Sequence, residues 1–250
     1  MILFFSDLDN TLIYSHRAPP PGEIIAAEYL NGHIQSYMTN KTYGFLSKSE
    51  EVLLVPTTTR TITQYARLAD TFAAFGCRYV LACNGGVLLN HNVVDPDWLA
   101  ETKKTAEDET DSLNEAEKIF LMRYPEHHIH SVDGIMLYAK TDSPAADADR
   151  LSGAVDTGKL SIYYDNRKVY CIPSSINKGN AVRRFLSRVS TSLTIAAGDS
   201  EMDVPMLNAV DVAILPRSLS ADVDAGTKYI ADPSVCFSDY ICDVMKELIH

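Results

Sequence analysis

Short apolar runs that stop at polar or turn-forming residues recur along the first third and the last third of the chain. Each run is too short for an ordinary helix, and each ends abruptly, which is typical of a strand buried on both faces of a parallel sheet. The runs occupy residues 2–5, 52–55, 79–82, 193–197 and 212–215. We therefore expect these five segments to be core strands.

Between several of these runs, apolar residues recur with a helical period. In residues 61–75 they fall at Ile62, Tyr65, Ala66, Leu68, Ala69, Phe72 and Ala73, and a similar pattern covers residues 180–189. Strands that alternate with helices predict an α/β fold, in which helices cover both faces of a parallel sheet.

The middle of the chain has a different pattern. Residues 97–124 are polar and rich in helix-forming residues, and three strand-like runs follow at 134–140, 160–164 and 168–172. We interpret residues 89–169 as a smaller α+β module inserted into an α/β core formed by residues 1–88 and 170–250.

A β-hairpin is predicted just beyond the first strand. Residues 24–30 and 33–38 are strand-like, and Asn31-Gly32 between them is the dipeptide that best favours a tight hairpin turn. The hairpin is expected to lie over the residues that follow the first strand.

Charge and cysteine content narrow the possible partners and the compartment. The formal net charge is −11, which disfavours nucleic acid and anionic lipid surfaces. The five cysteines are an odd number without a C-x-x-C pair, so we expect reduced thiols in a cytoplasmic protein. Neither a secretory signal nor a run long enough to span a membrane is expected. The oligomeric state is not indicated.

Two pairs of aspartates follow two of the predicted strands. Asp7 and Asp9 come after the first run, and Asp199 and Asp203 come after the run at 193–197. The carboxyl ends of parallel strands share one edge of a sheet, so these side chains are expected to meet there. Because crowded carboxylates repel one another, a hard divalent cation such as Mg²⁺ is expected among them.

These segments resemble the motifs of the haloacid dehalogenase superfamily, in the order in which that family has them. The segment Asp7-Leu8-Asp9-Asn10-Thr11-Leu12 is similar to its D-x-D-x-T signature, and Thr57-Thr58-Thr59-Arg60 follows a strand where the second motif places a Thr or Ser. Lys178 matches the third motif, and residues 198–203 match the fourth. Asn84-Gly85-Gly86 resembles a turn of the subgroup with a C2-type cap, which includes Cof-like sugar phosphatases and sucrose-phosphate phosphatases.

The resemblance implies a Rossmann-like, doubly wound core with an inserted cap, and a Mg²⁺-dependent phosphatase acting on a small phosphate ester, such as a sugar phosphate. Asp7 would be the nucleophile and Asp9 the general acid and base. Thr58, Thr59 and Lys178 would bind the phosphoryl group. The metal ligands would be Asp7, the backbone carbonyl of Asp9, Asp199 and, directly or through water, Asp203.

The sequence departs from the family pattern at Thr59, where many relatives have Gly. Arg60 could contact substrate or form a structural ion pair, and Asn84 could serve the turn or the substrate. His128 and His130 could share a strand face and bind a metal, although a polar cap strand explains them more simply. A phosphomutase and a non-catalytic binding module on the same fold are the alternative functions.

Overall fold

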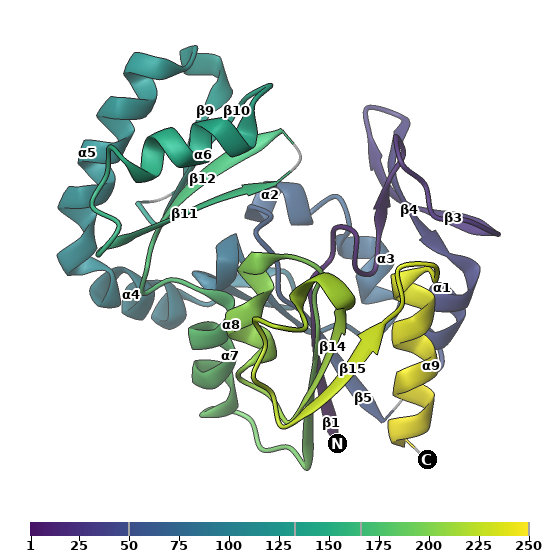
Figure 1. Ribbon diagram of the computed structural model, residues 1–250. Coiled ribbons are helices and arrows are strands. Elements are labelled where there is room, and N and C mark those ends of the chain that lie inside the picture. Colours follow the sequence, from purple (N-terminus) through teal and green to yellow (C-terminus); the bar gives the residue numbers. More distant parts are fainter. Residues whose placement is uncertain (50, 133, 166, 250) are drawn as a thin grey trace. The chain divides into compact units, whose positions relative to one another are not determined.

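The fold comes from a computed structural model that describes residues 1–49, 51–132, 134–165 and 167–249 (Figure 1). The chain divides into two compact units. The first combines Met1–Val94 with Lys178–His250, and the second is Asp95–Asn177. A smaller α+β unit is therefore inserted into a larger α/β unit. That residues 89–169 act as a cap stays a prediction.

A parallel sheet of five strands forms the centre of the first unit. Its order is β15-β14-β13-β1-β5, and each neighbouring pair is parallel. The strands are β1 (Ile2–Ser6), β5 (Val52–Pro56), β13 (Leu193–Ala197), β14 (Val212–Pro216) and β15 (Thr227–Ala231). Four of them were predicted from their apolar runs. The edge strand β15 was not, because its residues are mostly exposed and it lacks such a run.

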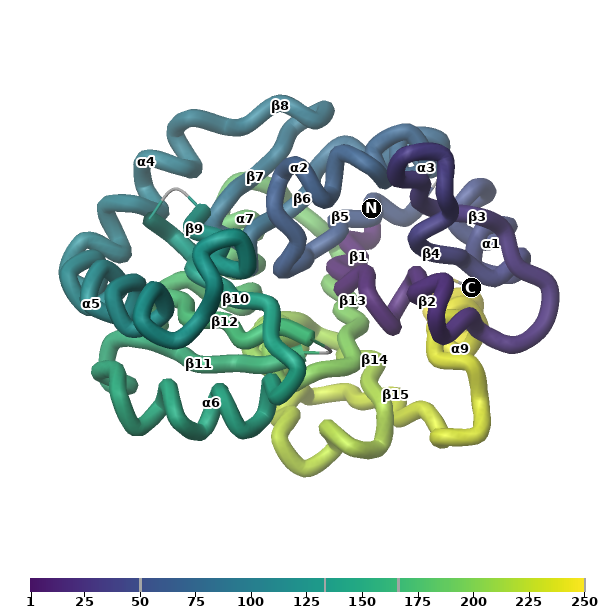
Figure 2. The backbone as a smooth tube through the Cα atoms, turned by 90° about the horizontal axis from the view of Figure 1, so that it is seen from above, coloured from purple at the N-terminus to yellow at the C-terminus, as the bar shows by residue number. Residues whose placement is uncertain are grey.

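Helices lie on both sides of this sheet (Figure 2). On one side is α7 (Lys178–Leu186), whose Phe185 ring meets the ring of Phe5 edge-on at 5.8 Å between centroids. On the other side are α1 (Asn40–Leu46) and α9 (Phe237–Ile249), with α9 packed against β14 and β15. The predicted α/β fold with a parallel sheet is confirmed.

The fifth predicted core strand takes a different place. β6 (Tyr79–Ala82) pairs antiparallel with β7 (Val87–Asn90), which in turn pairs with β8 (Val93–Val94). Its link to the central sheet is a parallel bridge between Thr57 and Leu81. The apolar run identified the strand correctly but did not reveal which strand it pairs with.

The predicted helix over residues 61–75 is two short helices instead. α2 (Ile62–Tyr65) begins with a capping box formed by Thr61 and Gln64, and α3 (Ala69–Ala73) follows after a break. At the break, the Leu68 and Ala69 amides donate to carbonyls three residues back rather than four. This tighter bonding pattern ends the first helix without a Pro or Gly.

The predicted hairpin is confirmed. β3 (Ile24–Leu30) and β4 (His33–Thr39) pair antiparallel, and β2 (Tyr14–Ser15) extends the sheet to the order β2-β4-β3. Asn31 and Gly32 both have positive φ, 52° and 77°, as a type I′ turn requires. The pairing register shifts on both sides of Glu28, which marks a β-bulge.

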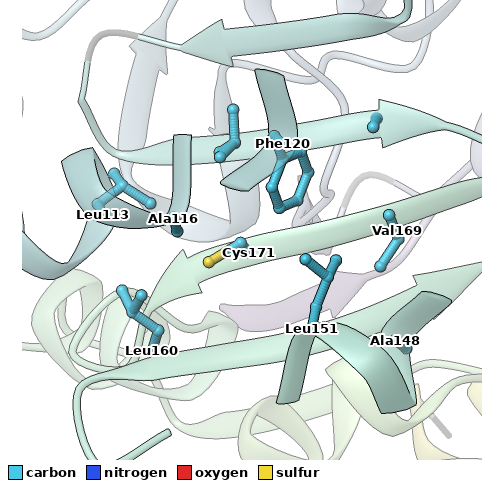
Figure 3. Close-up of a cluster of buried hydrophobic side chains, with 10 residues drawn as sticks. Leu113, Ala116, Phe120, Ala148, Leu151, Leu160, Val169 and Cys171 are labelled. Carbon is cyan, nitrogen blue, oxygen red and sulfur yellow. The ribbon is translucent and has the colours of Figure 1, made fainter. Parts of the chain in front are cut away.

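The second unit is an antiparallel sheet with helices on one face. Its order is β11-β12-β10-β9, from β9 (Ile129–Val132), β10 (Met136–Lys140), β11 (Leu160–Asp165) and β12 (Lys168–Pro173). Residues of α5 (Glu107–Arg123) and α6 (Pro144–Ser152) form one apolar cluster with the sheet (Figure 3). The helix α4 (Pro96–Thr105) precedes α5.

The remaining helices are short: α8 (Val204–Leu207), and the single-turn segments η1 (Cys83–Gly85), η2 (Glu126–His128), η3 (Glu201–Asp203) and η4 (Arg217–Leu219). All five cysteines are free thiols. Within the described ranges, no helix combines the length and the apolar character needed to cross a bilayer.

Candidate active site

The site is built where β1 and β13 end side by side at the same edge of the central sheet. Ser6 is paired in register with Ala197, and the Asp7 amide continues the ladder by donating to the Ala197 carbonyl at 2.9 Å. This pairing brings residues that are far apart in the sequence together. The two acidic segments therefore meet at one edge of the sheet, as predicted.

Three carboxylates converge at this edge. Single oxygens of Asp7, Asp199 and Asp203 all lie within 4.8 Å of one another. Asp203 is fully buried, Asp7 is 7% exposed and Asp199 is half-buried. A set of carboxylate oxygens suits a hard divalent cation, and such an ion would offset their mutual repulsion.

Lys178, the first residue of α7, is the cation that the protein itself places in this cluster. It is 1% exposed, and its Nζ donates to Asp7 Oδ1 at 2.5 Å and to Asp203 Oδ1. Burial disfavours its charged form, but the charges of Asp203 and Asp7 outweigh that effect and raise its pKa. The lysine therefore stays protonated between the two carboxylates.

The surroundings of the Asp7 carboxyl disfavour its ionised form. Burial raises its pKa well above the ordinary value; Lys178 opposes this, whereas Asp203, Asp199 and Asp9 add to it. A divalent ion would favour the ionised form of Asp7, which is the form that can act as a nucleophile.

Asp203 organises the loop after β13. Its Oδ2 accepts from the amides of Asp199 and Ser200 at 3.1 and 3.0 Å and from the Ser200 hydroxyl at 2.9 Å. Since Oδ1 accepts from Lys178, both carboxylate oxygens are engaged. Asp203 thus fixes the backbone that carries Asp199.

Thr11 is a site residue whose role the sequence reasoning did not assign. Its buried hydroxyl donates to Asp199 Oδ1 at 2.8 Å and so orients that carboxylate. The signal was present, because Thr11 is the last polar position of the segment 7–12. What the sequence could not show is which distant carboxylate the hydroxyl reaches.

Thr58 lies after β5, which is the neighbour of β1 on its other side, so it is placed at the same sheet edge. It is fully buried, and its hydroxyl accepts from the Arg60 amide at 3.1 Å. Thr59 is half-buried.

The Thr58 carbonyl accepts from the Asn84 amide at 2.9 Å, and Asn84 has a φ of 58°. Asn84 therefore serves the turn beside Thr58, and any contact with substrate stays a prediction.

Arg60 forms an ion pair with Asp9. Its Nε and Nη2 donate to the two oxygens of Asp9 at 2.7 and 2.8 Å, and Nη2 also donates to Glu28 at 3.0 Å. Of the two roles considered for Arg60, the geometry shows the ion pair. Glu28 comes from the hairpin, and the sequence reasoning did not identify it.

His127, His128 and His130 belong to the second unit. His130 on β9 stacks against the Tyr138 ring of β10 at 4.6 Å between centroids. In the part of the chain that the structure describes, the group able to hold a metal is Asp7, Asp199 and Asp203, and neither His128 nor His130 belongs to it.

Comparison with known proteins agrees with this geometry. The family model for haloacid dehalogenase-like hydrolases matches residues 56–233. The sucrose-phosphatase from Synechocystis sp. PCC6803 superposes with a TM-score of 0.62 at 15% identity, covering 99% of this chain and 98% of its own. A Thermoplasma acidophilum protein gives 0.63 at 14% identity, covering 100% and 98%.

The subclass IIB sugar phosphatase BT4131 gives a TM-score of 0.57 at 12% identity, covering 99% of each chain. At these identities the matches show a shared fold. Among curated protein sequences, none matches.

Proposed function

The chain belongs to the haloacid dehalogenase-like hydrolases, and from that premise we propose that it is a Mg²⁺-dependent phosphatase of a small phosphate ester. The observation that carries the proposal is the convergence of Asp7, Asp199 and Asp203 within 4.8 Å, beside the buried Lys178. A cluster of this kind suits a reaction in which a negatively charged phosphoryl group is transferred from one oxygen to another.

Asp7 is the nucleophile in this proposal. One of its carboxylate oxygens attacks phosphorus, and the bond from phosphorus to the ester oxygen breaks. The departing oxygen takes a proton from Asp9. Water then attacks phosphorus, its proton passes to Asp9, and the bond to Asp7 breaks to release inorganic phosphate.

The metal would be held by Asp7, Asp199, the Asp9 carbonyl and, directly or through water, Asp203. When bound, Mg²⁺ would neutralise charge on the phosphoryl oxygens and keep Asp7 ionised. Thr11 would orient Asp199 for this role, since its hydroxyl already donates to that carboxylate at 2.8 Å.

The phosphoryl group would be held by donors at the same sheet edge. Lys178 supplies a buried positive charge next to Asp7, and Thr58 and Thr59 follow β5, the neighbour of β1. An overall charge of −11 would repel a phosphate ester. Lys178 and the metal reverse the field locally.

The substrate is proposed to be a sugar phosphate. Support comes from two proteins of the same fold that are named for sugar phosphates, the sucrose-phosphatase and the sugar phosphatase BT4131. The inserted unit, Asp95–Asn177, would act as the cap that selects the leaving group.

The test is hydrolysis of p-nitrophenyl phosphate and a panel of sugar phosphates, with and without Mg²⁺. Wild type should release inorganic phosphate, EDTA should abolish release, and Mg²⁺ should restore it. Asp7→Asn should lower kcat at least about 10³-fold while the protein remains folded. Asp111→Asn, at an exposed position of α5, is the matched control and should behave as wild type.

Near-normal activity in Asp7→Asn would overturn the mechanism, and inactivity of wild type across the panel would overturn the function. Recovery of the phosphate on a second hydroxyl of the sugar, rather than as inorganic phosphate, would identify a phosphomutase.

A further inference from the structure

Glu28 is a buried carboxylate on the hairpin strand β3, where most residues are only half-buried or exposed. The residue is 1% exposed, and it lies at the β-bulge, where the register with β4 shifts on either side of it. A bulge re-aims a side chain, and bulges are frequent next to active sites. The local distortion thus turns an acidic group inward from a surface element.

Two arginines and a serine converge on this carboxylate. Arg67 Nε donates to Oε1 at 2.6 Å, while Arg60 Nη2 and the Ser36 hydroxyl donate to Oε2 at 3.0 and 3.1 Å. Burial alone would raise the pKa of Glu28, but its hydrogen bonds and charge interactions with Arg60 and Arg67 outweigh burial and lower it. Glu28 is therefore held as an anion in a fixed orientation.

Arg60 links Glu28 to Asp9, because it donates hydrogen bonds to both carboxylates. The Arg60 side chain is 10% exposed, whereas that of Asp9 is 42% exposed. Both Asp9 oxygens accept from Arg60, so the plane of the carboxyl group is set by the guanidinium. The proton that Asp9 donates in the proposed mechanism is carried on an oxygen lone pair that Arg60 does not use. The guanidinium in turn is set by Glu28, because its Nη2 is shared between the two acids.

We propose that Glu28 is a positioning residue that acts through Arg60 to aim the Asp9 carboxyl at the leaving oxygen. The inference rests on the proposed function, in which Asp9 protonates that oxygen. It assigns the hairpin a part in the reaction: the bulge holds Glu28, Glu28 holds Arg60, and Arg60 holds Asp9.

The stability gained from a buried ion pair does not by itself explain why a glutamate occupies position 28. Replacing a buried ion pair with apolar residues of similar volume is often neutral or stabilising, so packing alone would be served as well by an apolar side chain. The charge of Glu28 is explained if the orientation of the Arg60 guanidinium matters. The guanidinium makes a bidentate pair with Asp9, and such a pair fixes a geometry that a hydrophobic contact does not.

The test compares esters that need a proton donor with one that does not. Glu28→Gln keeps the shape of the side chain but removes the charge that anchors Arg60. The value of kcat/KM for alkyl or sugar phosphates should fall about 10–100-fold, because a misaimed acid protonates poorly. For p-nitrophenyl phosphate, whose leaving group departs without a proton, kcat/KM should stay within about threefold.

Lys41→Gln is the control. It removes the ion pair of Lys41 with Asp243, which involves neither Glu28, Arg60 nor Asp9, so it should leave the ratio of the two kcat/KM values unchanged. On an Arg60→Met background, Glu28→Gln should cause little further loss, since its route to Asp9 is already cut.

An equal loss for both ester types, or full additivity of Glu28→Gln with Arg60→Met, would overturn the positioning role. Should Glu28→Gln fail to fold, Glu28→Asp withdraws the carboxylate by one methylene and is judged by the same ratio. These outcomes are separate from failure of the proposed function, which would show as inactive wild type.

Discussion

Gly198 and Asp203 approach each other so closely that a β-carbon on residue 198 would lie 2.4 Å from the Asp203 β-carbon. Real side chains do not tolerate that separation, so the loop after β13 depends on the missing side chain. The same approach lets Asp203 accept from the Asp199 and Ser200 amides. Residue 198 is therefore a steric requirement of the acidic cluster.

Gly198→Ala should displace Asp203 and disturb the whole cluster. We expect the free energy of unfolding to fall by about 1–3 kcal/mol, the usual range for a forced overlap in a packed site, and Mg²⁺-dependent activity to be lost. Urea denaturation and Mg²⁺ titration of the folded variant measure the two effects. Gly226→Ala is the control, because nothing lies within 4 Å of a β-carbon there. A Gly198→Ala protein with normal stability and metal response would contradict the steric argument.

Lys178→Gln should leave Asp7 and Asp203 without the cation they share. Removing one partner of a buried ion pair typically lowers the free energy of unfolding by about 3–5 kcal/mol, and the Lys178 side chain is 1% exposed. Excess Mg²⁺ should recover part of that loss, since binding to the folded state stabilises it. Chemical denaturation with EDTA or with Mg²⁺ tests both statements. A Lys178→Gln protein as stable as wild type in EDTA would refute them.

Thr11→Val should weaken metal binding without removing a ligand. The hydroxyl donates to Asp199 Oδ1, and loss of a residue that orients a ligand usually lowers metal affinity about 10–100-fold. Thr11→Ser retains the hydroxyl and should remain close to wild type. Calorimetric titration with Mg²⁺ gives the affinities. Equal affinities for the valine and serine variants would show that the hydrogen bond has no such role.

Glu28 should contribute stability that depends on pH. Because Arg60 and Arg67 lower its pKa in the folded state, the contribution is fully present above the ordinary glutamate pKa of about 4.3. It is lost as the pH falls through the lower folded-state pKa. Glu28→Gln should therefore be about 2 kcal/mol less stable at pH 7, and the difference should shrink toward pH 3. Urea denaturation of both proteins across this range, in EDTA, is the measurement; a gap that widens with acid would contradict the sign.

The acidic site was predictable because its residues follow strands whose apolar runs can be recognised in the sequence. One residue separates each run from its aspartate, Ser6 before Asp7 and Gly198 before Asp199, so the rule for parallel sheets placed both aspartates at one edge. Edge strand β15 escaped detection because an exposed edge needs no apolar run.

Pairings between distant polar residues could not be predicted in the same way. Nothing in the local pattern around Glu28 indicates that it meets Arg60, 32 positions away, or that Thr11 reaches Asp199 across 188 positions. These contacts depend on where whole elements lie. Lys178 was found through its motif, yet its shared position between Asp7 and Asp203 became visible only in the fold.

The neighbouring placement of β1 and β13 also bears on how the protein is made. A ribosome that has synthesised the first 190 residues has already produced Asp7, the proposed nucleophile, but neither Asp199 nor the strand that must lie beside β1. Such long-range pairing forms late, after most of the chain has emerged. The proposed metal site can therefore form only after β13 and Asp199 have been synthesised.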